Sequence, residues 1–240
     1  MNKFIEKIQK ISKENGKTAI FVDMDGTITV YNVYPEHDVA KKMEEEYEQA
    51  EPASYVIELL EKRKASTIND TSYVLFELPL NAEPMNLYDI IYDMLQYKLV
   101  PILAHPERYS FVQKDPELIY DLIEKGVLIQ SNYGSIIGQY GEKAQMIVKR
   151  FLESNMVHFL GSDVHRPNTI YPQIPKILNI ISDIIGEDKL EELTTINPQL
   201  VLNNKKIEVA EPIDFKLSLK EKFIIKCWYG KGNLTEKPLF

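Results

Sequence analysis

Residues that can bind a metal ion recur along this sequence, each at the end of an apolar run typical of a β-strand. These residues are Asp23, Asp25, Glu77, His105, Gln130, Asn132, Asp163 and His165. Residues two positions apart in a strand point to the same face. Asp23 and Asp25 therefore form one pair and Asp163 and His165 another, provided that each segment stays extended. Ligands of these types suit Mn²⁺, Fe²⁺ or Zn²⁺, and the imidazole content argues against a pure Ca²⁺ site.

The cost of burying ionisable side chains favours a metal site over a separate structural role for each candidate ligand. Ionisable side chains are costly to bury unless something pairs them, and four of them end predicted buried strands: Glu77, His105, Asp163 and His165. A single histidine near a strand is more often a hydrogen-bonded structural residue. We prefer that interpretation for His37 and His158.

Two arginines follow the candidate ligands closely in the sequence. Arg108 lies three residues after His105, and Arg166 is adjacent to His165. A guanidinium group is a planar donor that can grip two phosphate oxygens at once. Arg108 could instead form a structural ion pair with a local carboxylate such as Glu107. A metal site flanked by arginines favours phosphoester hydrolysis, because metals and arginines both stabilise the charge that develops on phosphate.

The elements that must position these groups alternate between strand and helix from Ser72 onward. Strands are predicted at 73–79, 99–106, 127–132 and 156–163, and helices at 85–98, 115–126, 142–155 and from 174 to 204. This order predicts an α/β fold with a parallel sheet, either open or closed into a barrel. Active-site groups gather at the C-terminal ends of parallel strands, so the candidate ligands are expected at one edge of the sheet.

The two ends of the chain have a different character. The segment 18–25, "TAIFVDMD", predicts a buried strand, and 36–64 is helix-like, strongly acidic and broken at Pro52. From about Pro212 the chain is rich in lysine, which predicts a loosely packed extension or a docking surface. We therefore expect three parts, at 1–64, 65–210 and 211–240.

Composition narrows the class of protein. The 240 residues are 44% hydrophobic and 27% charged, as in an ordinary globular protein. The net charge of −8 argues against a nucleic-acid partner. The single cysteine, Cys227, indicates a reducing compartment. The opening segment is amphipathic and charged, unlike a secretory h-region, and no apolar run is long enough to span a bilayer, so a cytoplasmic protein without membrane insertion is expected.

Four segments, "YVLFELP", "PILAHPERY", "SNYGSIIGQYG" and "HFLGSDVHRP", resemble successive motifs of the PHP superfamily. The resemblance covers about residues 72–204. It is closest to the manganese-dependent tyrosine phosphatases encoded with bacterial capsule and exopolysaccharide genes. That family implies a distorted (β/α)7 barrel, a multinuclear metal site and, as partner, the phosphotyrosine tail of a bacterial tyrosine kinase. By motif, Glu77, His105, Asp163 and His165 would be metal ligands, and Arg108 and Arg166 would bind phosphate.

The first strand departs from that family. The H-x-H strand and the next glutamate of the family have no counterpart here, and "DMDGT" instead resembles motif I of the HAD phosphohydrolases over about residues 18–64. In a HAD enzyme Asp23 would be the nucleophile and Asp25 the acid/base, but the later HAD motifs are not found. A D-x-D pair projects two ligands from a strand end as an H-x-H pair does. Asp23 and Asp25 are therefore predicted to complete the metal site of an incomplete PHP-like barrel with a HAD-like first strand.

Three functions follow in order of preference. The first is a metal-dependent protein-tyrosine phosphatase that uses Mn²⁺, with Fe, Zn or Mg as alternatives. The second is a catalytically impaired fusion protein that binds only a metal or a partner. The third is a HAD-type phosphatase that forms an aspartyl-phosphate.

Overall fold

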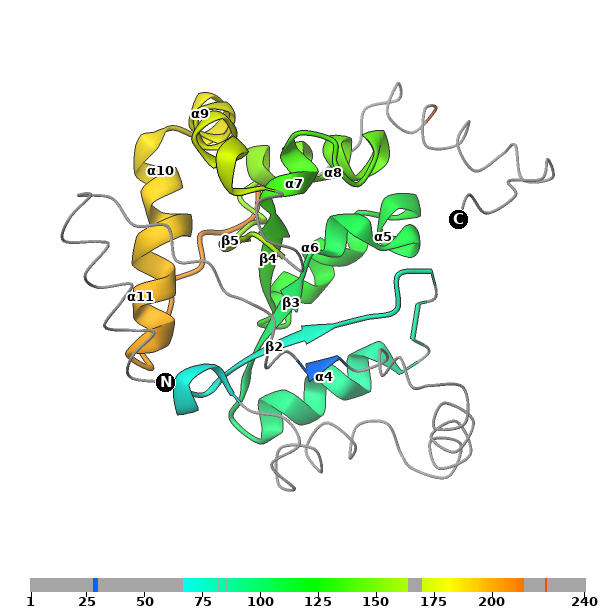
Figure 1. The fold of residues 1–240 in the computed structure, drawn as a ribbon. Helices are drawn as coiled ribbons and strands as arrows, with labels where there is room; N and C mark the ends of the chain where they lie inside the picture. The colour runs from blue at the N-terminus through cyan, green and yellow to red at the C-terminus, as the bar shows by residue number, and fades with distance from the viewer. Residues whose placement is uncertain are drawn as a thin grey trace, which may run out of the picture.

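A five-stranded parallel sheet forms the centre of the molecule, with its strands in sequence order (Figure 1). The computed structural model describes residues 28–29, 67–81, 83–84, 86–163, 170–213 and 223. The strands are β1 (Ile28–Thr29), β2 (Tyr73–Glu77), β3 (Val100–Ala104), β4 (Leu128–Asn132) and β5 (Phe159–Gly161). Sequential order in a parallel sheet requires a crossover after every strand, and helices supply those that the structure describes.

The helices follow the strands in the alternation that the sequence predicts. The α-helices are α4 (Leu87–Gln96), α5 (Ser110–Lys114), α6 (Glu117–Glu124), α7 (Tyr133–Ile136), α8 (Glu142–Glu153), α9 (Ile174–Ile185), α10 (Glu187–Glu191) and α11 (Asn197–Leu202). Three short 3₁₀ turns are η1 (Ile68–Asp70), η2 (Pro106–Arg108) and η3 (Tyr171–Gln173), and η4 (Glu192–Ile196) is a π-helical turn.

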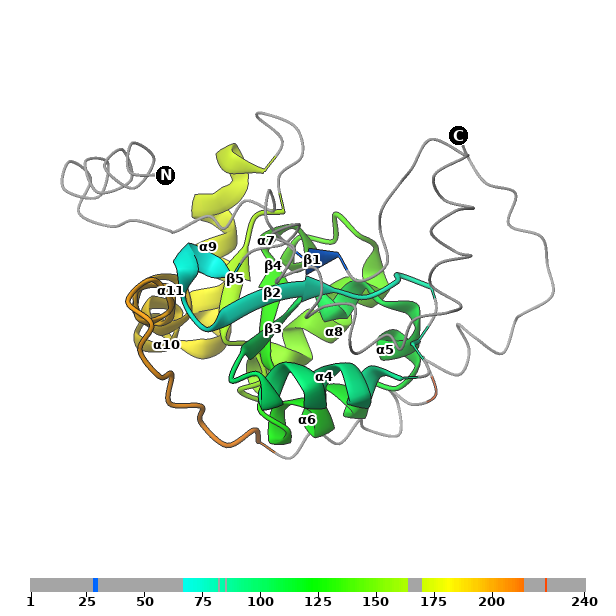
Figure 2. The same ribbon diagram turned by 90° about the horizontal axis from the view of Figure 1, so that it is seen from below.

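Both faces of the sheet are buried, which is why its strands are almost continuously apolar. One face carries Val74, Phe76, Leu103, Ile129 and Leu160, and it packs with α4, α6, α8 and α9 in the larger core. The other face forms a smaller core that includes Val201 of α11. Figure 1 shows α10 and α11 on one side of the sheet and α5 and α6 on the other. Figure 2, seen from below, shows α4 and α6 side by side along the sheet.

The strand register brings the C-terminal strand ends to one edge. Thr29 pairs beside Glu77, Ala104 beside Gln130 and Asn132 beside Gly161. The residues that end or follow β2, β3, β4 and β5 therefore lie along the same edge, as the sequence predicts.

Two boundaries differ from the sequence-based expectation. The predicted strand at 156–163 pairs only over Phe159–Gly161, and Asp163 has a left-handed backbone with φ 47°. Asp163 is thus no longer part of an extended strand, so the condition for placing it on one face with His165 is not met. The single helical stretch at 174–204 is interrupted at Gly186, which has φ 82°. The helix then continues from Glu187 to Leu202 through the π-helical turn η4, which comes just before Pro198, a residue that cannot donate an amide hydrogen bond.

The predictions for the N-terminal segment fall almost entirely outside the described residues. The structure describes β1 there, which begins three residues after Asp25. The predicted strand 18–25, the acidic segment 36–64 and all but residue 223 of the tail beyond residue 213 lie outside the described residues.

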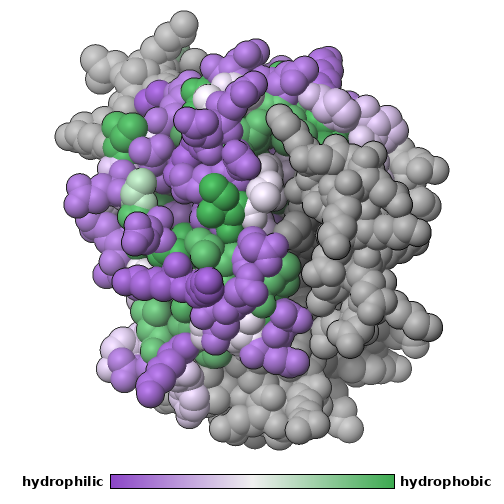
Figure 3. Space-filling view, turned by 90° about the vertical axis from the view of Figure 1, so that its left-hand side faces the viewer, coloured by the Kyte–Doolittle hydropathy of each residue, from purple (hydrophilic) through white to green (hydrophobic). Residues whose placement is uncertain are grey.

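The surface over α10 and α11 is mainly hydrophilic, with scattered hydrophobic side chains (Figure 3). Ile196, at the end of η4, is 47% exposed. Within the described part of the chain, no helix is both long and apolar enough to cross a membrane.

Replacing Leu103 by alanine should strongly destabilise the protein. Leu103 is fully buried in the central strands, so Leu103→Ala leaves a cavity in the larger core. We expect a loss of about 2–5 kcal/mol in the free energy of unfolding, measured by urea denaturation. The control is Tyr92→Ala on α4, because Tyr92 is 61% exposed, and it should change stability by less than about 0.5 kcal/mol. Equal effects of the two variants would contradict the assigned core.

Candidate metal and phosphate site

Side chains from the ends of β2 and β3 form the first part of the candidate site. Glu77 is the last residue of β2, and His105 directly follows β3. Glu77 Oε1 lies 3.1 Å from His105 Nε2, and the His105 side chain is almost completely buried. The other ring nitrogen, Nδ1, is buried without a hydrogen-bond partner among the described residues. His105 therefore retains a nitrogen that can bind another group.

Tyr109 fixes the geometry of these two strand ends. Its ring packs edge-on against the His105 ring, with centroids 5.6 Å apart. Its hydroxyl donates to the carbonyl oxygen of Ala104 at 2.8 Å and accepts from the amide of Leu78 at 2.9 Å. Burial raises the pKa of Tyr109 well above its usual value, so the hydroxyl stays neutral and available as a donor.

The second part of the site is centred on Asp163, two residues after β5. Arg108 of η2 forms an ion pair with Asp163 Oδ2 through its Nη1. Asn132, the last residue of β4, donates from Nδ2 to the same oxygen at 2.9 Å. Asp163 is 9% exposed. The two donors replace water around a carboxylate that would be costly to bury without partners.

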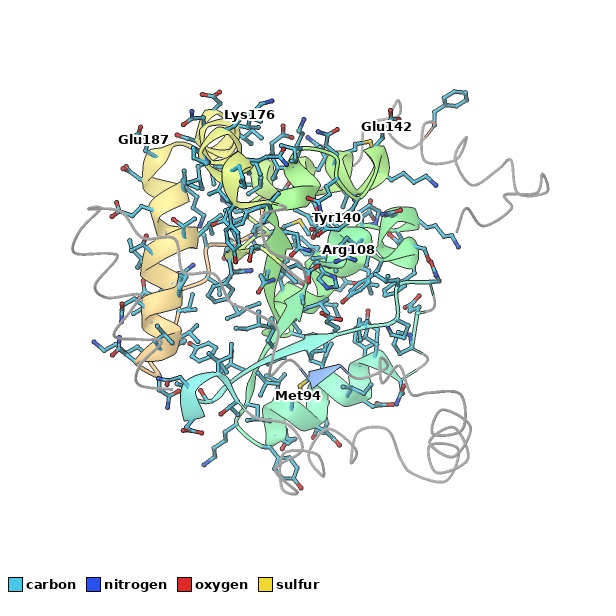
Figure 4. All side chains as sticks on the ribbon, in the orientation of Figure 1. Met94, Arg108, Tyr140, Glu142, Lys176 and Glu187 are labelled. Carbon is cyan, nitrogen blue, oxygen red and sulfur yellow. The ribbon has the colours of Figure 1, made fainter. Side chains whose placement is uncertain are left out.

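Arg108 also packs on an aromatic ring. Its guanidinium carbon lies 4.2 Å from the centre of the Tyr140 ring, and Figure 4 shows the two labelled side chains close together. This is a cation–π arrangement, which limits the orientations open to the guanidinium. Burial, and secondarily the charge of Asp163, raises the pKa of Tyr140.

Gly134 explains why Tyr140 can lie there. A Cβ atom on Gly134, in α7, would come within 2.9 Å of Tyr140 Cε2 and 2.7 Å of Gln139 Oε1. Gly161 has the same function for Gln130, because a Cβ there would lie 2.4 Å from Gln130 Nε2. The glycines of "SNYGS" and "LGSD" thus leave space for polar and aromatic side chains at the edge of the sheet.

Arg108 does form an ion pair with a carboxylate, as the alternative interpretation expected, but its partner is Asp163 and not Glu107. The Glu107 side chain is completely buried and turns inward. Glu107 Oε1 accepts from the backbone amide of Asn132 at 2.9 Å and from the Ser135 hydroxyl at 2.6 Å. In a 3₁₀ turn successive side chains point about a third of a turn apart. The side chains of adjacent residues in η2 therefore contact different partners.

The side chains of the described residues are of types that bind metal ions, but they include only some of the predicted ligands. Of the predicted ligands, the structure describes Glu77, His105 and Asp163, and it leaves Asp23, Asp25 and His165 outside the described residues, together with Arg166. Among the residues it describes, no three His, Cys, Asp or Glu side chains form a ready metal-binding group. The free Nδ1 of His105 and the nearby carboxylate are nonetheless donors that suit a first-row divalent ion.

Three residues of the site have contacts that the sequence does not indicate. The sequence places Asn132 at a strand end, but its bond to Asp163 spans 31 positions. Glu107 is next to Arg108 in the sequence, and only the fold directs its carboxylate to Asn132 and Ser135. Tyr140 lies in a quoted motif, and only the folded chain brings its ring to Arg108.

His158 is structural, as predicted. Its Nδ1 accepts the backbone amide of Ile129 at 3.0 Å, and the ring is 4% exposed. Its backbone carbonyl accepts from the Asn197 side chain at 3.0 Å, which joins β5 to α11. Burial, with a smaller contribution from Lys189, lowers the pKa of His158 to about 3.

An apolar pocket lies apart from these polar groups. It is lined by Leu75, Ile102 and Phe159 of the sheet and by Val201 of α11, with Gln130 as its polar member. Its lining offers no cation for phosphate.

The fold and site define a class of α/β protein with ionisable groups gathered at the C-terminal edge of a parallel sheet. The family model described as "Capsular polysaccharide synthesis, CpsB/CapC" matches residues 36–203, more than half of the chain. The chain therefore belongs to the CpsB/CapC family.

Relatives with assigned names are similar over the same region. The tyrosine-protein phosphatase YwqE of Bacillus subtilis is 33% identical over 148 residues, which cover 62% of this chain and 58% of YwqE. The tyrosine-protein phosphatase CpsB of Streptococcus pneumoniae is 29% identical over 156 residues, covering 63% of this chain and 64% of CpsB. The matched region thus spans less than two thirds of the length of either relative.

A solved structure agrees with the described fold. It comes from crystallographic work on YwqE from Bacillus subtilis and CpsB from Streptococcus pneumoniae, described as unique metal-dependent tyrosine phosphatases. The match has a TM-score of 0.62 and 32% identity, and it covers 68% of this chain and 65% of the other. The parallel α/β fold is therefore shared with that structure.

Removing the Tyr140 ring should release Arg108. In Tyr140→Leu the guanidinium loses its aromatic contact, whereas Tyr140→Phe retains the ring as a matched control. We expect the Nε–Hε resonance of Arg108 in an NMR spectrum to move in the leucine variant only. The leucine variant should also be less stable than the phenylalanine variant by about 0.5–1 kcal/mol. An unchanged Arg108 resonance in Tyr140→Leu would contradict the stacking.

His158 should make stability depend on pH below neutrality. The unfolded imidazole titrates near 6.5 and the native one near 3, so between these values the unfolded state binds more protons. Stability therefore falls as the pH drops from about 6.5 toward 3. His158→Asn keeps an acceptor for the Ile129 amide but does not titrate. Between pH 7 and pH 5 the wild-type protein should lose about 2 kcal/mol more than this variant in urea denaturation. Parallel losses would refute this role.

Proposed function

We propose that this chain is a metal-dependent protein-tyrosine phosphatase. The observation that carries the proposal is the Arg108–Asp163–Asn132 cluster beside the Glu77–His105 pair. It combines metal-binding groups with a guanidinium suited to phosphate at one sheet edge. The names of YwqE and CpsB support tyrosine phosphate as the group that is hydrolysed.

In this proposal six residues hold the metal: Asp23, Asp25, Glu77, His105, Asp163 and His165. The metal is Mn²⁺, with Fe, Zn or Mg as alternatives. When bound, it would supply Lewis-acid stabilisation and an activated water. Thr29 pairs beside Glu77, and Asp25 lies four residues earlier, at most about 14 Å along an extended chain. That span supports a contribution from the first segment.

The residues of the chain orient the substrate. Arg108 and Arg166 bind the phosphate oxygens, and Tyr140 limits the directions in which Arg108 can point. Phosphate binding exchanges one anionic partner of Arg108, the Asp163 carboxylate, for another. Asn132 still donates to Asp163 during this exchange and keeps the carboxylate in place.

The proposal extends to the barrel and to the partner. The sequential parallel order of β1 to β5 supports a PHP-like barrel that is incomplete or distorted relative to seven βα units. The parts at 1–64, 65–210 and 211–240 remain our division of the chain.

The proposed substrate is the phosphotyrosine tail of a tyrosine kinase of capsule or exopolysaccharide synthesis. The proposed location is the cytoplasm, where a lone cysteine stays reduced.

Loss of the His105 imidazole should remove both metal and activity. We expect purified protein to contain Mn or Fe and to hydrolyse a phosphotyrosine peptide, and His105→Ala to abolish both. Arg150→Lys, on the surface of α8, is a control that should leave both unchanged. Metal analysis and a peptide phosphatase assay check the result.

Asp23→Asn separates the three candidate functions. In a HAD-type phosphatase it would abolish turnover while His105→Ala would not, because Asp23 would form the covalent intermediate. In the proposed metallophosphatase His105→Ala is the more damaging change. Absence of turnover with every divalent metal would favour the impaired fusion protein that binds only a metal or a partner.

A further inference from the structure

We propose that Glu107 is a positioning residue, which holds Asp163 in place through Asn132. In the interactions described above, Glu107 touches none of the six residues proposed to hold the metal and does not touch the guanidinium of Arg108. Its influence on the site passes through the end of β4. The inference rests on the proposed function only in the readout of Mn²⁺ affinity, which requires the proposed metal site.

The surroundings of Glu107 are unusual for a carboxylate. The side chain is 0% exposed, and Oε1 accepts two hydrogen bonds, from the Asn132 amide and from the Ser135 hydroxyl. Oε2 has no hydrogen-bond partner among the described residues. Burying a carboxylate is costly, and an apolar residue of similar volume would avoid that cost. A carboxylate kept there is best explained by the groups that it orients.

Asn132 connects Glu107 to Asp163 through two hydrogen bonds. The bond from Glu107 fixes the main chain of Asn132, where β4 ends and α7 begins. The side chain of the same residue then donates to Asp163 Oδ2. Asn132 is itself 0% exposed, so it has little room to reorient. A shift of its main chain would move the donor that holds Asp163.

The Glu107 backbone is fixed independently of its carboxylate. Gln113 donates from Nε2 to the Glu107 carbonyl oxygen at 2.9 Å, and the amide of Arg108 donates to the carbonyl oxygen of His105 at 3.0 Å. A substitution of the Glu107 side chain should therefore leave η2 in place. Its effect can be followed at Asn132 and Asp163 without disturbing the turn that carries His105 and Arg108.

Three substitutions separate positioning from general stability. Glu107→Ala removes the acceptor, and Glu107→Gln keeps an oxygen that can accept both bonds. Ser135→Ala removes one of the two bonds but does not touch Asn132. The first readout is NMR of the metal-free protein, from the Asn132 side-chain amide and the Asp163 carboxyl carbon. We expect both signals to move in Glu107→Ala, and to stay near wild type in Glu107→Gln and Ser135→Ala.

The second readout is the affinity for Mn²⁺, measured from free Mn²⁺ by electron paramagnetic resonance. Losing an outer hydrogen-bond partner of a ligand typically weakens metal binding about ten- to a hundredfold. We expect a loss of this size in Glu107→Ala and its recovery in Glu107→Gln. Ser135→Ala should lower the melting temperature with little change in affinity. This measurement requires no turnover.

The outcomes separate this inference from the proposed function. If the wild-type protein binds Mn²⁺ but hydrolyses no phosphotyrosine, the proposed function fails and the affinity series still decides the role of Glu107. If it binds no Mn²⁺, the NMR series decides. Unmoved Asn132 and Asp163 signals in Glu107→Ala would overturn the inference. If the alanine variant does not fold, Glu107→Asp is measured instead. Its side chain is one methylene group shorter, so the carboxylate no longer reaches the Asn132 amide, and the same result is expected.

Discussion

The Asp163 carboxylate is the point on which the site depends, because three parts of the chain meet there. Arg108 reaches it from the turn after β3, Asn132 from the end of β4, and Asp163 itself follows β5. An almost buried anion can persist only where donors replace the water it has lost. That requirement fixes the relative positions of three strand ends, and it determines which direction the Arg108 guanidinium faces.

Hydrogen bonds to buried side chains also hold the polar groups next to Asp163 in place. Tyr109 bonds to the backbone after β2 and at the end of β3, and so holds the pair of Glu77 and His105 at their strand ends. Glu107 performs a comparable function at the end of β4. The edge of the sheet is therefore a connected polar network, in which each member is positioned by another. Networks of this kind are sensitive to the loss of one partner, because an unsatisfied buried group is costly.

The apolar side of the fold makes this network possible. Both faces of the sheet are covered, so a slip by one residue would move every side chain of a strand to the opposite face and disrupt the packing of both cores. The register that results aligns Ala104 with Gln130 and Asn132 with Gly161. Glycines at 134 and 161 then leave space for Tyr140 and Gln130. Packing determines where the strands end, and the polar side chains of the site lie at those ends.

The sequence by itself determined strands β2 to β5, helices α4, α6, α8 and α9, and the edge at which Glu77, His105 and Asp163 gather, but not the short helices α5 and α7. Apolar periodicity and turn residues are local signals, and parallel strands necessarily bring their C-terminal ends together. Only the tertiary structure decided the partners. Whether Arg108 would bind Glu107 or Asp163 could not be read from spacing, since the nearer residue in sequence is the wrong one. The left-handed backbone at Asp163 and the contact between Tyr140 and Arg108 likewise depend on packing between distant segments, which no local pattern encodes.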